Sequence, residues 1–301
     1  MKLLGICASN ITNDKEMNYE ISQLYQEAKK VYDNIITFNP LDISINLRKN
    51  REQPEIFIKN TNLSQLETLI VRKLGDCEES TAVLVHSLME CGCYITDSLN
   101  RFQGQPPSKI LTTLKRYKAN VGIDTYFAFN KANATELIKK LSINDEFPLL
   151  LKPISGKGGE GIEYLNDFEK AVQVIENLFQ TNNSNEFTIM FQKYIIFDSE
   201  YRVMLFNNHC LGIAEKKQSK EIIQANAQQG GKYVAVDCPE VIEFAIKNKT
   251  QQGILGIDVA RDKEDNLYIL EENYAPKWEA LDKVLESSVA KQIINYLTKS
   301  D

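Results

Sequence analysis

The sequence KPISGKGGEGI occupies residues 152–162, directly after the apolar run 148–151, and contains four glycines and two lysines. Glycine lets backbone N–H groups close on a ligand without a Cβ in the way, and lysine supplies the point charge that a phosphate chain needs. The stretch therefore predicts a phosphate-gripping loop. Its candidate residues are Lys152, Ser155, Gly156, Lys157, Gly158, Gly159 and Gly161.

Two other interpretations of this loop stay open from the loop alone. Its spacing satisfies G-x-G-x-x-G through Gly156, Gly158 and Gly161, which is the pattern of a dinucleotide-binding turn. That turn requires a helix directly after the loop, whereas residues 162–165 alternate as a strand does. A strand, a glycine loop and a second strand would form a flap over a nucleotide. The third alternative is a surface hairpin that binds nothing.

The composition indicates a soluble globular protein of two or three domains. The chain has 301 residues, 43% of them hydrophobic and 25% charged, with a formal net charge of −6. No long block of one charge favours nucleic acid or an anionic membrane as a partner. Residues 1–8 form too short an apolar run for a signal sequence, and no stretch approaches the ~20 apolar residues of a membrane span. We therefore expect a cytoplasmic protein whose six scattered cysteines are reduced.

Alternating strands and helices in the first hundred residues predict a small parallel sheet. We expect strands at 2–8, 34–38, 67–72 and 94–96 and helices at 14–32 and 81–91. The cluster QGQPP at 103–107 breaks regular structure and marks a domain boundary. The predicted domains are 1–105, 106–190 and 191–301.

A second unit begins at Ser108, which is a predicted N-cap for a helix over 109–120. After that helix we expect a strand at 124–128, a helix at 135–141, the two strands that flank the glycine loop, and a helix at 167–179.

The strand after this unit ends in Gln192, Lys193, Tyr194 and Ile195. An apolar strand with such an end is a common place for adenine to bond to backbone groups, although an ordinary core strand has the same pattern. Glu200 and Arg202 follow two residues apart, so their side chains share one face of a strand. One could hold ribose hydroxyls and the other a phosphate oxygen, and a surface ion pair is the alternative.

Three oxygen-bearing residues near the C-terminus predict a metal site. Asp258 lies in an apolar strand, a second strand ends in Glu271 and Asn273, and the turn 262–266 between them predicts an antiparallel pair. Glu271 and Asn273 share one face by alternation, and the three side chains can converge as the hard oxygen ligands that magnesium prefers. Glu272 falls on the other face, where we expect a solvated or domain-facing charge.

The order of these features resembles the ATP-grasp fold and is most similar to the RimK-type family of bacterial ribosomal-protein glutamate ligases. The similarity runs from about Leu69 to Tyr296 and covers the N-terminal strands weakly. It implies an α/β protein in which two α+β subdomains grip ATP, preceded by a small Rossmann-like α/β domain.

The resemblance also implies a role for each candidate residue. Lys109 and Lys152 would contact the ATP phosphates, the loop 155–161 would close over them, and Gln192 to Ile195 would form the adenine hinge. Glu200 would bind the ribose, Arg202 would contact an anion near the reacting phosphate, and Asn226 would lie at the triphosphate end. Magnesium, with manganese as an alternative, would be held by Asp258, Glu271 and Asn273.

The implied activity is that of an ATP-dependent carboxylate–amine ligase. ATP would phosphorylate a carboxylate of an amino acid, peptide, protein or small molecule, and an amine would then attack the acyl phosphate. Phosphoryl transfer suits these residues because it needs positioning and neutralisation of charge more than covalent help. Neither His86 nor His209 adjoins a nucleophile motif, so we assign them no role.

The chain departs from the family pattern at several positions. Gln224 stands where an arginine is typical, and Gln228 and Gln229 stand where histidine and arginine are common. Losing fixed cations there implies another substrate, lost activity, or compensation by a nearby lysine. The candidates for that compensation are Lys216, Lys217 and Lys232, of which Lys216 is the predicted catalytic residue. Trp278, the only tryptophan, would either shape the acceptor pocket or close the core of the last domain.

Two further functions stay open beside the ligase. One is a kinase of a small hydroxylated substrate on the same scaffold, which would release a phosphorylated product and no amide. The other is an ATP-binding regulatory protein without turnover, which the neutral Gln224 favours. A homo-oligomer is compatible with either.

Overall fold

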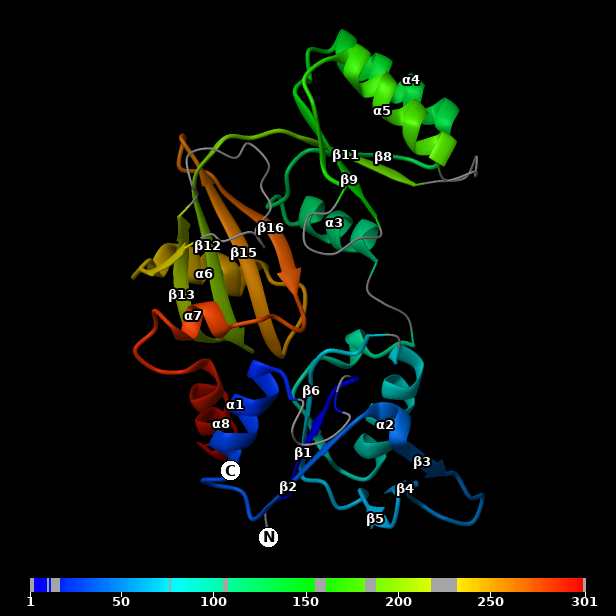
Figure 1. Ribbon diagram of the computed structural model, residues 1–301, viewed down its shortest axis with the longest axis vertical. Coiled ribbons are helices and arrows are strands. Elements are labelled where there is room, and N and C mark those ends of the chain that lie inside the picture. Colours follow the sequence, from blue (N-terminus) through cyan, green and yellow to red (C-terminus); the bar gives the residue numbers. More distant parts are fainter. Residues whose placement is uncertain are drawn as a thin grey trace.

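The computed structural model describes residues 3–9, 11, 17–75, 77–104, 108–154, 161–181, 188–217 and 232–299. They form three main sheets, with the N-terminal sheet at the bottom of Figure 1 and the other two above it. No helix in these ranges is long and apolar enough to span a membrane.

The N-terminal sheet is parallel, as predicted, with strand order β2-β1-β6-β7. Its inner strands, β1 (Leu3–Cys7) and β6 (Thr68–Val71), are buried along their whole length, which is typical of a parallel sheet covered on both faces. The remaining elements of this part are β2 (Asn34–Phe38), β7 (Tyr94–Ile95), α1 (Tyr19–Ala28) and α2 (Glu78–Glu90).

Two features of the N-terminal part differ from prediction. Helix α1 covers Tyr19–Ala28 rather than 14–32, because the side chain of Asn18 accepts a hydrogen bond from Ile21 N (2.9 Å) and caps the helix there. A small antiparallel sheet was not predicted. It consists of β3 (Ile43–Asn46), β4 (Glu55–Ile58) and β5 (Thr61–Asn62), which are short strands that stay mostly half-exposed.

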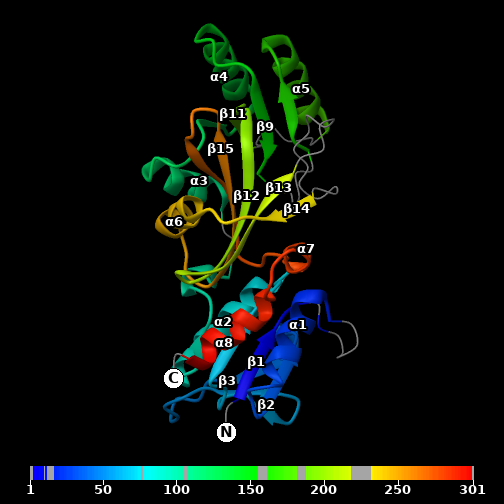
Figure 2. The same cartoon turned by 90° about the vertical axis from the view of Figure 1, so that its left-hand side faces the viewer.

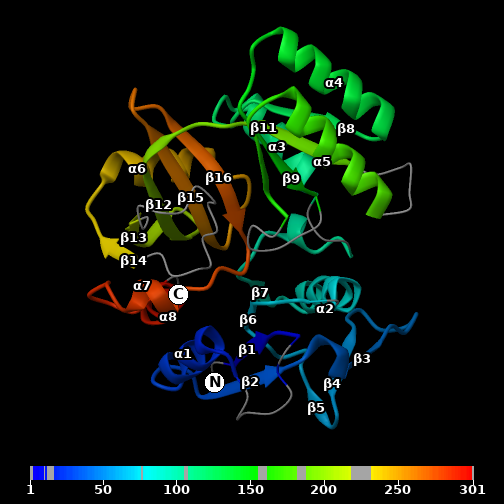
Figure 3. The same cartoon turned by 45° about the horizontal axis from the view of Figure 1, so that its top comes forward.

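The second main sheet is antiparallel, with order β10-β9-β11-β8. Helices α4 (Lys131–Ile143) and α5 (Phe168–Thr181) pack together along one side of it, as Figure 3 shows. The strands are β8 (Thr125–Ala128), β9 (Leu149–Pro153), β10 (Glu163–Leu165) and β11 (Ile189–Lys193). The strand after the glycine loop is confirmed as β10. Helix α3 (Lys109–Lys118) precedes the sheet, and its predicted cap is confirmed because Ser108 Oγ accepts from Leu111 N.

The third sheet, β14-β13-β12-β15-β16, is also antiparallel. The predicted pairing of the last two strands is confirmed. Its elements are β12 (Phe197–Phe206), β13 (His209–Lys217), β14 (Lys232–Ala235), β15 (Ile254–Asp262) and β16 (Leu267–Asn273), with α6 (Pro239–Asn248) packed on one face.

The C-terminal helices connect the first and third sheets. After α7 (Glu279–Asp282), helix α8 (Val289–Lys299) lies beside α1, as Figure 2 shows. One apolar cluster accordingly joins Leu4 and Ile21 from the N-terminal part with Phe206, Trp278 and Ile293. The division into domains at residues 105 and 190 stays a prediction.

Gly253, the residue before β15, provides a test of this packing. Its φ is +107°, and a Cβ there would lie 2.6 Å from Asp97 Oδ1 and 2.7 Å from the Asp97 Cα. Gly253→Ala is therefore expected to lower the free energy of unfolding by about 3 kcal/mol, through strain and overlap together. Gly92 also has positive φ (+84°) but open space around it, so Gly92→Ala should cost only about 1 kcal/mol. Equal losses in urea unfolding would contradict the contact with Asp97.

Candidate nucleotide and metal site

The register of the third sheet brings the predicted metal ligands to one face. Asp258 on β15 is directly opposite Glu271 on β16, and Gly256 is opposite Asn273, so the three oxygen-bearing side chains share one side of the strand pair. The pairing shifts between Asp258 and Val259, which marks a bulge beside the site. This donor set, two carboxylates and an amide oxygen, suits magnesium. Among the described residues there is no cluster of three His, Cys, Asp or Glu that could hold a metal, and the predicted set combines two carboxylates with the amide of Asn273.

Arg202 on β12 forms an ion pair with Asp258. Its Nε and Nη2 donate to the two carboxylate oxygens at 2.5 and 2.9 Å, and both side chains are largely buried. Burial lowers the pKa of Arg202, but Asp258 outweighs it and holds that pKa above its ordinary value. The predicted anion contact and a predicted metal ligand thus face each other across neighbouring strands.

Glu200 forms an ion pair with a lysine of the third sheet. Its Oε2 lies 3.4 Å from Lys216 Nζ on β13, and both side chains are largely buried. Tyr233 on β14 is the strand partner of Lys216. Burial raises the pKa of the Tyr233 hydroxyl, with Arg202 opposing that shift. No motif in the sequence singled out Tyr233.

Lys152 on β9 is a residue of the second sheet whose charge interacts with this face. Its Nζ donates to Gln192 Oε1 (2.5 Å), and Gln192 Nε2 donates to Thr125 Oγ1 (3.0 Å), so the amide fixes the ammonium. Burial lowers the pKa of Lys152 to about 8; Glu271 and Glu200 raise it, and Arg116 and Lys109 lower it further. One predicted phosphate contact, Lys152, therefore interacts electrostatically with one predicted metal ligand, Glu271.

Arg116 is a candidate site residue that sequence analysis missed. Its Nη1 donates to Leu270 O (3.0 Å), next to Glu271, and its Nε is buried without a partner among the described residues. Burial lowers the pKa of Arg116, and Glu272, Tyr274, Glu271 and Asp258 oppose this shift. Arg116 follows Lys109 by seven residues, two turns of α3, so helical periodicity starting from Lys109 would have found it.

The predicted adenine hinge lies between the second and third sheets. Lys193 N donates to Asp124 O (2.9 Å) and Tyr194 N to Pro148 O (3.0 Å), so these two amides are used within the protein. The ammonium of Lys193 pairs with Glu146 (3.1 Å). A cavity of about 580 Å³ borders the hinge. Its lining includes Lys193 and Ile195, residues 120 and 122–124 before β8, and residues 262 and 266–268 around the turn between β15 and β16.

Several predicted residues lie outside the described part of the chain. They are Ser155, Gly156, Lys157, Gly158, Gly159 and Asn226, with Gln224, Gln228 and Gln229. Gly161, where the chain is described again after the loop, has a φ of +75°, which favours glycine. Lys109 is exposed at the first turn of α3.

The expectation for Glu272 is wrong in one respect, because this carboxylate is buried rather than solvated. Only 6% of Glu272 is exposed, and it accepts from Thr250 N (3.0 Å) and Thr250 Oγ1 (2.9 Å). Alternation places it on the face that α6 covers, where Thr250 follows the end of that helix. Trp278 is fully buried in the core, the second of the two predicted alternatives.

The lowered pKa of Lys152 predicts proton uptake when ATP binds. In the free protein the ammonium loses its proton as the pH rises through about 8, and adjacent phosphates would raise that pKa again. At a pH of about 8.5, ATP binding should therefore take up a fraction of a proton, and the affinity should fall as pH rises further. Calorimetry in two buffers of different ionisation enthalpy measures this uptake. Lys152→Met should abolish it, and the same uptake in that variant would exclude Lys152 as its source.

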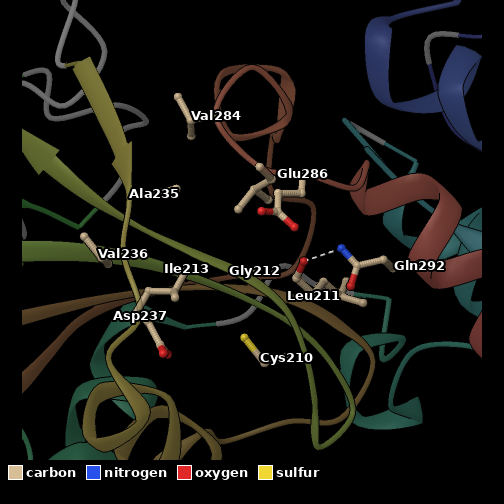
Figure 4. A pocket seen from close by; sticks show the side chains of 11 residues that line it. Cys210, Leu211, Gly212, Ile213, Ala235, Val236, Asp237, Val284, Glu286 and Gln292 are labelled. Atoms are coloured by element: carbon tan, nitrogen blue, oxygen red, sulfur yellow. Dashed lines mark hydrogen bonds between the residues drawn. The ribbon is translucent and has the colours of Figure 1, made fainter.

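A second cavity lies apart from this face. It measures about 440 Å³ and is lined by residues of β13, β14 and the C-terminal segment, where Gln292 donates to Leu211 O (Figure 4). None of the predicted nucleotide or metal residues lines it.

Known proteins share both the fold and the sequence pattern of this chain. The structure of the ATP-grasp ligase PsnB complexed with minimal precursor matches with a TM-score of 0.76 at 13% identity, covering 100% of this chain and 99% of that one. A RiPP-associated ATP-grasp ligase of Chryseobacterium gregarium, in complex with ADP and a leader and core peptide, matches with a TM-score of 0.68 at 18% identity, covering 100% and 98%. At these identities the likeness shows an ATP-grasp fold.

The sequence then places the chain within that class. Residues 109–297 match the model of the RimK-like ATP-grasp domain, so the chain belongs to the RimK-like ATP-grasp family. The probable alpha-L-glutamate ligase 1 of Shewanella denitrificans is 23% identical over 288 residues, 94% of each chain.

Proposed function

We propose that this protein is an ATP-dependent ligase that joins a carboxylate to an amine on a peptide substrate and releases ADP and phosphate. The proposal rests on the register of the third sheet. Asp258 on β15 lies opposite Glu271 on one neighbouring strand and opposite Arg202 on the other. This face offers hard oxygen ligands beside fixed cations, which is what transfer of a phosphoryl group requires.

The nucleotide would lie between the second and third sheets. Lys152, Arg116 and Lys109 would neutralise the phosphates, and Ile195 is the hinge residue whose amide we expect to meet adenine. The carboxylate of Glu200, already oriented by Lys216, would bind the ribose. Asp258, Glu271 and Asn273 would hold magnesium, which supplies charge neutralisation between the phosphates when bound. Manganese in its place stays a prediction.

Arg202 would bind the reacting anion. Its guanidinium already engages a carboxylate through two donors in the structure, which is the fork geometry that carboxylates and phosphoryl groups need. A substrate carboxylate oxygen attacks the γ-phosphorus and ADP leaves. The amine then attacks the acyl carbon, the phosphate departs with its oxygen, and the amine loses a proton.

A peptide is the proposed substrate class because of what related proteins handle. The curated relative is named a glutamate ligase, and the solved ligase from Chryseobacterium holds a leader and core peptide. We therefore expect a glutamate or a peptide carboxylate as one reactant. A cytoplasmic location and a homo-oligomer stay predictions.

The discriminating experiment measures ADP release with ATP and magnesium against pools of amino acids and acidic peptides. Release that requires both a carboxylate and an amine is the expected result. Release with a hydroxylated substrate alone would identify a kinase instead. Tight ATP binding without any release would identify a regulatory protein.

A further inference from the structure

The strand pair that carries the metal ligands is held at one end by the N-terminal sheet, and we propose that Arg72 is the residue that positions it. This inference rests on the proposed function because it concerns the same metal site. Arg72 directly follows β6, at the carboxyl edge of the parallel sheet, and only 2% of it is exposed. Its backbone N–H donates to Cys7 O (2.9 Å), which fixes it to the neighbouring strand β1.

The side chain of Arg72 reaches the segment that continues from β16. Its Nη2 donates to Pro276 O (2.8 Å), and its guanidinium carbon lies 4.7 Å from the centre of the Trp278 ring. Glu20 on α1 accepts from Trp278 N (3.1 Å). The chain just beyond Asn273 is therefore fixed by two buried side chains of the N-terminal part, and Figure 1 shows how it descends from β16 toward that part.

Pro276 in turn contacts the metal-binding strands. A Cβ on Gly256 would lie 2.6 Å from Pro276 Cβ and 3.3 Å from Arg202 Nη1. Gly256 is also the strand partner of Asn273. Pro276, Arg202 and Asn273 thus meet around one glycine, with no space for Pro276 to shift toward the strand. In a packed interior, a displacement of Pro276 would be transmitted to the neighbouring groups.

The same edge of the N-terminal sheet also holds the start of β15. Asp97 Oδ1 accepts from Ile254 N (3.4 Å) and pairs with Arg101 (3.2 Å), while Arg101 Nη2 donates to Arg72 O (2.9 Å). Asp97 and Arg101 are both buried. One connected network of charged groups therefore contacts the start of β15 and the segment that follows β16, although Arg72 Nη1 is buried without a partner among the described residues.

Arg72 suits a positioning role because its planar guanidinium group donates hydrogen bonds in fixed directions. Displacing Pro276 should disturb Asn273 and Arg202 while leaving the hinge around Ile195 unaffected, since the hinge lies at the opposite end of the third sheet, where Phe197 pairs with Asp262. Groups that orient metal ligands affect metal affinity without touching the metal.

The test titrates the full-length protein with magnesium at saturating ADP. Magnesium binding is measured both by calorimetry and by the rise in melting temperature. Arg72→Met is expected to raise the half-saturating magnesium concentration about tenfold. Its affinity for metal-free ADP should stay within about twofold of wild type, a difference of only about 0.4 kcal/mol. A general loss of structure would weaken both magnesium binding and ADP binding.

Two further variants keep the test decisive. Gly256→Ala displaces Pro276 from the other side of the same contact and should produce the same shift, even where Arg72→Met folds poorly. Arg261→Met is the matched control, because Arg261 lies at the far end of β15 and pairs with Glu240 and Asp265. An unchanged magnesium requirement in Arg72→Met and Gly256→Ala would overturn the role of Arg72 and leave the proposed function intact. If the wild-type protein shows no magnesium-dependent ADP binding, the proposed function fails as well.

Discussion

Glu271→Gln is expected to lower turnover by about 10²–10³-fold, the range for losing one preorganised electrostatic contact at a reacting group. The substitution keeps the size and the strand position of the side chain but removes the charge opposite Asp258. The magnesium concentration needed for activity should also rise, because only one carboxylate would remain in the donor set. Steady-state rates of ADP release across a magnesium series measure both effects.

Glu272→Gln is the matched control for this prediction. Glu272 is the next residue on the same strand, but it faces the opposite side and accepts hydrogen bonds from Thr250. Its substitution should lower the free energy of unfolding by about 1–3 kcal/mol, the range for a disrupted buried hydrogen bond, and leave the magnesium requirement unchanged. Wild-type turnover and magnesium dependence in Glu271→Gln would refute the metal assignment.

Lys152→Met is expected to raise the KM for ATP by about 10- to 100-fold, because a charge-assisted contact with a phosphate contributes about 1.5–3 kcal/mol. The methionine keeps most of the side chain's apolar volume in the half-buried position and removes only the ammonium that Gln192 orients. The unfolding midpoint should change little, since burial already disfavours the charged form. Initial rates over an ATP series measure the change.

Lys140→Met controls for the loss of a positive charge as such. Lys140 forms an exposed ion pair with Glu136 on α4, and an exposed pair contributes only about 0–1 kcal/mol. Its KM for ATP should match that of the wild-type protein. An unchanged KM in Lys152→Met would exclude the phosphate contact.

The fold was predictable where burial imposes a strong pattern. Strands such as β1 and β6 consist mostly of buried apolar residues, and the helix cap at Ser108 depends on local chemistry alone. The small sheet β3-β4-β5 was missed because its strands are short and mostly half-exposed, so they carry little hydrophobic signal. The packing of α8 beside α1 joins the two ends of the chain, and no local pattern encodes such a contact.

The parts of the site that come from strands adjacent in the sequence were predictable. Glu271 and Asn273 share a face by alternation, and the short turn after β15 fixed their partner as Asp258. The ion pair of Arg202 with Asp258 depends on β12 pairing with β15, which lies three strands later in the chain. Long-range pairing of this kind leaves no signal in a single sequence. Glu272 was misjudged for the same reason, because its partner Thr250 comes from the end of another element.

The transfer of oxygen from substrate to phosphate tests the central claim most directly. L-Glutamate and a peptide ending in glutamate, both labelled with ¹⁸O in their carboxyl groups, are incubated with the protein, ATP and magnesium. Mass spectrometry then gives the label in the released phosphate. An acyl phosphate forms through a substrate oxygen, so the account predicts one ¹⁸O in each phosphate that accompanies an amide. Amide formation with unlabelled phosphate, or phosphate retained on a hydroxyl of the product, would contradict it.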